Sequence, residues 1–91
     1  MKYKQTIMGY DVVNTGSACP EQYDVYKDAK QVGYLRLRHG YFRVDVPECG
    51  GETVYESNPD GDGQFTDEER GYHLISAIAA IDAYYKREVP A

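Results

Sequence analysis

Hydrophobic and polar residues alternate along the first two thirds of the chain, with the period of two that is typical of β-strands. Four runs show this alternation: residues 22–28, 32–38, 41–46 and 52–57. His39 and Gly40 alone separate the second run from the third, which predicts a two-residue hairpin turn with Gly40 at positive φ. Residues 29–31 are expected to turn the chain earlier. The opening residues 5–13 are a further candidate strand.

The last third of the chain changes to a helical period. Leu74, Ile78 and Ile81 recur at spacings of four and three, and the stripe continues to Tyr85 with Ile75 beside it. We expect this stripe to face a sheet. The opposite side of the helix should carry these four residues: His73, Ser76, Ala80 and Arg87.

The helix ends are marked by their own signals. Thr66 and Glu69 have the spacing of a capping box, in which each side chain satisfies a backbone amide of the first turn. Lys86 and Arg87 suit the negative end of the helix dipole. The prediction is a helix from about residue 66 to 87.

Together these elements predict one α+β domain over residues 1–91: an antiparallel meander of about three to five strands, covered by one C-terminal helix. Four side chains of the central hairpin should point towards the helix: Leu35, Leu37, Phe42 and Val44. The alternate side chains would then lie on the other face of the sheet.

Composition is that of a small globular chain, with 91 residues of which 42% are hydrophobic. No apolar run is long enough to cross a bilayer and no secretory signal is recognisable at the start, so we expect a soluble cytoplasmic protein without a membrane partner. Cys19 and Cys49 are too few for a disulfide scaffold, although a single bridge between them is an alternative to free thiols. No paired Cys or His spacing indicates a zinc site.

Residues 58–69, NPDGDGQFTDEE, resemble the calcium loop of EF-hand proteins. Aligned on Gly63, the loop places Phe65 at the apolar eighth position, just before the exiting helix. The resemblance implies Ca²⁺ as a possible cofactor, held by six oxygen-bearing residues: Asn58, Asp60, Asp62, Gln64, Thr66 and Glu69. It covers only these residues, and no whole-chain family is recognised.

The same stretch has a purely structural interpretation. "NPDG" and "DG" favour turns, and acidic residues favour a helix N-terminus without any metal. The preceding residues 52–57 look extended, whereas an EF-hand has an entering helix and normally a second hand as its partner. The sequence therefore leaves a calcium loop and a turn as alternatives.

Charge is strongly segregated along the chain. Residues 44–69 contain nine acidic residues and no Lys or Arg, while the net charge of the whole chain is −5. Such a segment can steer the protein towards a partner with a basic surface, for example a nucleic-acid-binding protein. The residues expected to bind that partner are Asp45, Glu48, Glu52, Tyr55 and Glu56, with Asp60 and Asp62 continuing the acidic edge.

A second candidate surface is the side of the central hairpin that faces away from the helix. Guanidinium groups bind oxyanions and tyrosines stack, so this face could bind phosphates, a nucleotide or a partner's carboxylates. Its residues are Tyr34, Arg36, Arg38, Tyr41 and Arg43. The chain lacks the element order of RNA-recognition motifs, and we do not expect direct nucleic-acid binding.

No catalytic motif is recognisable, and a chain of this size rarely forms a substrate cavity in addition to a core, so we expect no enzyme activity. The main hypothesis is that the chain is a small acidic binding protein that acts by occupying a macromolecular partner. Phage and mobile elements encode proteins of this size and charge as inhibitors of nucleic-acid-targeting defences, including anti-CRISPR and DNA-mimic types, and the analogy rests on those properties alone. Calcium binding is the alternative, and nucleotide sequestration by the Arg/Tyr face is a weaker one.

Overall fold

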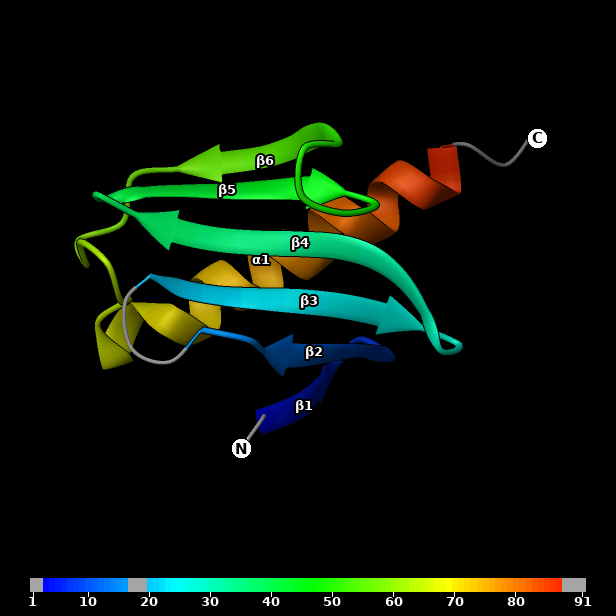
Figure 1. The fold of residues 1–91 in the computed structure, drawn as a ribbon, viewed down its shortest axis with the longest axis horizontal. Helices are drawn as coiled ribbons and strands as arrows, with labels where there is room; N and C mark the ends of the chain where they lie inside the picture. The colour runs from blue at the N-terminus through cyan, green and yellow to red at the C-terminus, as the bar shows by residue number, and fades with distance from the viewer. Residues whose placement is uncertain (1–2, 17–19, 88–91) are drawn as a thin grey trace.

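The computed structural model describes residues 3–16 and 20–87, which form one antiparallel sheet and one helix (Figure 1). The strands are β1 (Tyr3–Ile7), β2 (Tyr10–Asn14), β3 (Glu21–Lys27), β4 (Lys30–Arg38), β5 (Tyr41–Val46) and β6 (Glu52–Ser57), and the helix is α1 (Asp67–Arg87). The sheet has six strands in sequence order, and α1 crosses one of its faces. The predicted α+β meander with a covering C-terminal helix is confirmed, with six strands rather than three to five.

Residues 5–13 do not form a single strand. They contribute to both β1 and β2, because Met8 and Gly9 turn the chain with φ values of 54° and 82°. A two-residue hairpin turn requires such positive φ values, and Gly9 supplies one without steric cost. This turn was not predicted from the sequence, because the apolar side chain of Met8 continues the pattern of a strand.

Two more tight turns connect the central strands. His39 and Gly40, with φ values of 55° and 72°, form the turn predicted between β4 and β5. The turn between β3 and β4 lies at Asp28 and Ala29, one residue earlier than predicted, with φ values of 53° and 68°. Such φ values are uncommon for residues other than glycine.

The hydrophobic core fills the space between the sheet and α1. Its fully buried members include the four hairpin residues predicted to face the helix: Leu35, Leu37, Phe42 and Val44. At Gly33 the helix approaches the sheet so closely that a Cβ atom would lie 2.5 Å from Cδ1 of Ile81. Gly33 therefore determines how near the middle of β4 can come to α1.

Two residues of α1 lie on the side opposite to the one predicted. His73 is buried, and its ring stacks on Phe65 with the centroids 5.2 Å apart. Ile75 is 55% exposed, since it lies on the outer side of the helix. The spacing of Leu74, Ile78 and Ile81 predicted the buried stripe correctly. At the start of the helix the core also includes Phe65, and His73 is buried against its ring.

A buried ion pair joins β3 to the first turn of α1. Glu21 Oε2 lies 2.8 Å from Arg70 Nε, and Glu21 Oε1 accepts a hydrogen bond of 3.0 Å from the Phe65 amide. Tyr23 donates its hydroxyl proton to the same carboxylate. Burial alone would raise the pKa of Glu21, but these hydrogen bonds hold it below its usual value. The carboxylate therefore remains charged and fixes the start of the helix against the sheet.

Candidate functional site

The face of the sheet that α1 leaves uncovered carries three arginines on two adjacent strands. Arg36 and Arg38 belong to β4 and Arg43 to β5, and we call them the arginine cluster. Arg36 lies directly opposite Arg43 in the strand register, and Arg38 lies opposite Tyr41. Like charges placed directly opposite one another on a sheet are destabilising, so this arrangement costs free energy in the isolated protein.

Two donor atoms of the arginine cluster lack hydrogen-bond acceptors within the described part of the chain. The Nε atoms of Arg36 and Arg43 are buried and make no hydrogen bond there. Arg43 Nε does lie 3.2 Å from Asp45 Oδ2, an ion-pair contact without hydrogen-bond geometry. Buried N–H donors without an acceptor are uncommon because they lose their hydration, and an incoming oxyanion would satisfy them.

The cluster borders two open cavities. One of about 330 Å³ is lined by Arg36, Arg38, His39, Tyr41 and Arg43. The other, of about 420 Å³, shares three of those residues and reaches Asp62 and Gly63 of the acidic loop. A carboxylate or phosphate group on the sheet surface could therefore contact more than one arginine at once.

Tyrosine hydroxyl groups complete this face. Tyr41 donates a hydrogen bond of 2.6 Å to Glu56 on β6, and this bond raises the pKa of the Tyr41 hydroxyl. Tyr34 donates one of 3.3 Å to Gln22 on β3. The structure thus brings all five residues of the predicted Arg/Tyr face together on the uncovered side of the sheet.

The predicted acidic surface is only partly brought together. Glu48, Glu52 and Glu56 are exposed around β6 and the loop before it. Asp45 is 2% exposed, and its carboxylate accepts hydrogen bonds from the Thr53 hydroxyl at 2.8 Å and from the Gly50 amide at 3.2 Å. It therefore holds the β5–β6 loop and does not lie on the surface.

Tyr55 also lies elsewhere than predicted. Its half-buried side chain packs on the helix side of the sheet, where its ring meets the edge of Phe42 at a centroid distance of 6.0 Å. Alternation along β6 places Glu56 on the uncovered face and Tyr55 on the other. The two residues therefore cannot serve one flat contact surface.

The EF-hand-like residues form a loop that packs on the rest of the fold. The Gly40 amide donates to the Asp62 carbonyl at 2.7 Å, and the Glu21 amide donates to the Gly63 carbonyl at 2.8 Å. Asn58 donates its side-chain amide to the Gly40 carbonyl at 3.3 Å. The segment before the loop is strand β6, where an EF-hand would have its entering helix.

Glu69, expected as the bidentate calcium ligand, accepts hydrogen bonds from three backbone amides of the loop. The donors are Asp60 at 2.9 Å and Gly61 and Thr66 at 2.8 Å each. Burial opposes ionisation of Glu69, but these amides lower its pKa below the usual value. The Glu69 amide donates in turn to the Thr66 hydroxyl at 3.3 Å, which confirms the capping box.

The described residues contain no group of three or more His, Cys, Asp or Glu side chains arranged to hold a metal ion. Gln64 and Thr66 are exposed in the same loop. Of the two cysteines, Cys49 is an exposed free thiol and Cys19 lies outside the described residues. Residues 58–69 thus form a turn closed by backbone hydrogen bonds to Glu69, and calcium binding by this loop stays a prediction.

The pairing of Arg36 with Arg43 across the hairpin was not predicted from the sequence, although the sequence contains a signal for it. A two-residue turn at His39 and Gly40 fixes the register of the hairpin, and that register places Arg36 opposite Arg43. The absence of acceptors for their Nε atoms depends on neighbouring strands and has no sequence signal.

The chain matches no protein-family model, no curated protein and no solved structure. No helix among the described residues is both long enough and apolar enough to cross a membrane. The function of the chain is therefore inferred from the geometry of the site.

Proposed function

We propose that this chain is a binding protein that occupies a protein partner through the uncovered face of its sheet. The observation that carries the proposal is the cross-strand pair of Arg36 and Arg43, whose buried Nε donors have no acceptor among the described residues. A carboxylate of the partner placed on the arginine cluster would accept from these donors and offset the repulsion between the two guanidinium groups.

The exposed carboxylates beside this face extend the same contact. Asp62 is exposed and lines one of the cavities at the arginine cluster, and the exposed Glu56 is the cross-strand partner of Arg43. Basic side chains on the partner would meet these carboxylates, while one of its acidic groups enters the cluster. Peripheral charges mainly accelerate association, whereas buried charge pairs mainly slow dissociation.

This proposal keeps the expectation of a partner with a basic surface and changes the residues that contact it. A nucleic-acid-binding effector of a defence system is one such partner, and inhibition of it remains a prediction supported only by size and charge. A net charge of −5 opposes direct attachment of the whole molecule to a nucleic acid.

The partner can be captured by a photo-crosslinking residue at Tyr41, which is 39% exposed and lines the arginine cluster. The matched control carries the same residue at Tyr72, which is 68% exposed on α1. We expect a protein crosslinked from position 41 and absent from position 72. Equal crosslinking from both positions would contradict use of the sheet face.

Binding measurements with the purified partner then distinguish the contribution of the arginine cluster from that of the exposed carboxylates. Arg36→Gln should raise Kd about tenfold or more, chiefly through faster dissociation, because it removes a buried charged donor. An Asp62→Asn variant should slow association and flatten its salt dependence, because Asp62 lies at the edge of the arginine cluster. Arg87→Gln, at the exposed end of α1, is the control with the same change of charge. An unchanged Kd for Arg36→Gln would remove the arginine cluster from the binding surface.

A further inference from the structure

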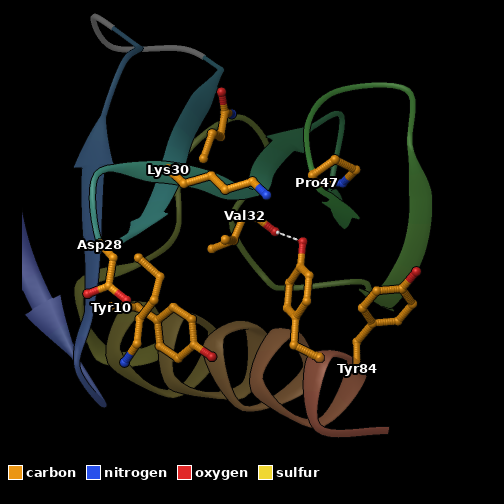
Figure 2. Close-up of a pocket in the computed structure, with 9 residues that line it drawn as sticks. Tyr10, Asp28, Lys30, Val32, Pro47 and Tyr84 are labelled. Carbon is orange, nitrogen blue, oxygen red and sulfur yellow. Dashed lines mark hydrogen bonds between the residues drawn. The ribbon is translucent and has the colours of Figure 1, made fainter. Parts of the chain in front are cut away.

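A further cavity lies on the helix side of the sheet and is distinct from the arginine cluster. It has a volume of about 710 Å³, within the range of small-molecule sites. Figure 2 shows it between the β3–β4 hairpin, the loop after β5 and the C-terminal half of α1. Tyr10, Val32, Pro47 and Tyr84 line its walls, so that most of its surface is apolar or aromatic.

Tertiary hydrogen bonds hold two of the tyrosines that line it. Tyr85 donates its hydroxyl proton to the Val32 carbonyl at 2.9 Å, and Tyr10 donates to Asp82 at 2.8 Å. A β-bulge makes Val32 the extra residue between Gln31 and Gly33, which turns its side chain inwards. A ligand would therefore meet walls that are already ordered, which reduces the entropic cost of binding.

The mouth of the cavity carries an unfavourable pair of charges. Lys27 and Lys30 are direct partners in the strand register, on either side of the turn at Asp28 and Ala29. Like charges in this position repel, and Ala29 adds strain because its φ of 68° is unfavourable for a residue with a Cβ atom. An anion bound at the mouth would offset the repulsion between the two ammonium groups.

The two lysines differ in their contacts. Lys27 Nζ lies 4.7 Å from the centroid of the Tyr10 ring and 3.5 Å from the Gly9 carbonyl oxygen. Lys30 makes no ion pair with any described residue, and its side chain extends across the cavity above Val32 (Figure 2). Asp28 is the one carboxylate that lines the cavity. The mouth therefore has an excess of one positive charge, centred near Lys30.

We propose that this cavity binds a small molecule with a planar aromatic body and a single carboxylate. The carboxylate would lie at the Lys30 ammonium, and the ring would pack against Tyr84, Val32 and Pro47, because aromatic walls favour flat partners. Polyphosphates fit less well, since Asp28 opposes additional negative charge and no arginine fork lines the cavity.

Titration of the full chain with naphthoate and its neutral counterpart naphthamide, followed by backbone amide NMR, tests the proposal. Naphthoate should bind about tenfold more tightly than naphthamide and shift the amides of Val32 and Tyr84. Lys30→Gln should abolish that preference, whereas Lys30→Arg should keep it. Lys4→Gln, on the exposed part of β1, is the charge-matched control and should change nothing.

Equal affinity for the acid and the amide, or no shift at Val32 and Tyr84 at millimolar naphthoate, would overturn the proposal. A preference that survives Lys30→Gln would overturn the role of Lys30. Naphthyl phosphate should bind no more tightly than naphthoate, and tighter binding would overturn the assignment to a single carboxylate. All of these changes lie on exposed side chains, so the folded state of each variant can be verified from the same spectra.

Discussion

At the scale of residues, some carboxylates of this chain accept hydrogen bonds from other groups of the fold, whereas others are exposed to solvent. Asp45 and Glu69 accept from backbone amides and side chains of the loops they close. Glu48 and Glu52 are exposed. The sequence makes all four look equivalent, because it reports their charge but not their partners. At this scale the residues of the acidic segment divide into loop-forming and surface groups.

Glu69→Gln should destabilise the protein in the absence of calcium. The amide side chain retains one acceptor oxygen, so it cannot satisfy the amides of Asp60, Gly61 and Thr66 together. We expect Tm to fall by roughly 5 °C, as for loss of a helix cap in a domain of this size. Thermal unfolding followed by circular dichroism measures the change.

Glu68→Gln is the control, since Glu68 is exposed in the same first turn of α1. It should leave Tm nearly unchanged. Calorimetric titration of the wild-type chain with millimolar calcium tests the EF-hand resemblance directly. Heat of binding that disappears in Glu69→Gln would contradict the interpretation of residues 58–69 as a turn.

At the scale of elements, two glycines show how the same residue serves opposite purposes. Gly33 lies in β4 where α1 crosses it, and a Cβ atom there would meet Ile81. Gly71 lies in the first part of α1, and a Cβ atom there would have no neighbour within 4 Å. Packing therefore requires glycine in the strand, whereas the helix tolerates it at a cost in backbone entropy.

The two Gly→Ala changes should alter stability in opposite directions. Gly71→Ala should raise the free energy of unfolding by about 0.5–1 kcal/mol, because alanine favours the helix and meets no obstacle. Gly33→Ala should lower it by about 1–3 kcal/mol, since the buried Ile81 has little room to move. Urea denaturation provides both values.

Ile81→Val provides the matched test of the contact at Gly33. It removes the Cδ1 atom that lies nearest to the added methyl group. In the double variant the cost of Gly33→Ala should become smaller than in the wild-type background. Strictly additive effects would show that the close approach is not the cause.

For the whole molecule, a charged link holds the start of the helix against the sheet. Arg70 of α1 contacts the Glu21 carboxylate through Nε at 2.8 Å and through Nη2 at 3.2 Å. The same arginine donates to the Phe65 carbonyl at 3.1 Å. Loop, strand and helix thus share one hydrogen-bond network centred on Glu21 and Arg70.

Stability should therefore fall at acid pH through Glu21. Its folded-state pKa lies below the unfolded value of 4.5, so its contribution is complete above that pH and is lost as pH falls through the lowered pKa. Glu21→Gln should cost about 3 kcal/mol at neutral pH, because it leaves Arg70 without its charged partner. The difference from the wild type should narrow as pH decreases below 4.5.

Chemical denaturation at a series of pH values measures that difference. A double-mutant cycle with Arg70→Gln should show that the two effects are strongly coupled at neutral pH and less so in acid. A difference between wild type and Glu21→Gln that stays constant from neutral to acid pH would contradict the assignment of this carboxylate.

The sequence alone determined the order of the elements and much of their detail. Alternation gave the central strands and the buried side of the β4–β5 hairpin, and Thr66 with Glu69 gave the start of α1. These features are local: they depend on residues a few positions apart, and the His39–Gly40 turn even fixes a strand register. The turn at Met8 and Gly9 was missed because Met8 continues the apolar pattern of a strand, and the turn after β3 was placed one residue too late.

Only the tertiary structure decided which chemical groups are available. It buried Asp45 and His73, placed Tyr55 and Glu56 on opposite faces, and left Arg36 without an acceptor in the described part of the chain. It also formed the cavity at Lys30 from β2, the β3–β4 hairpin, the loop after β5 and α1, which are distant in sequence. Burial and pairing depend on which segments pack together, and that long-range arrangement is a property of the whole fold rather than of any local pattern.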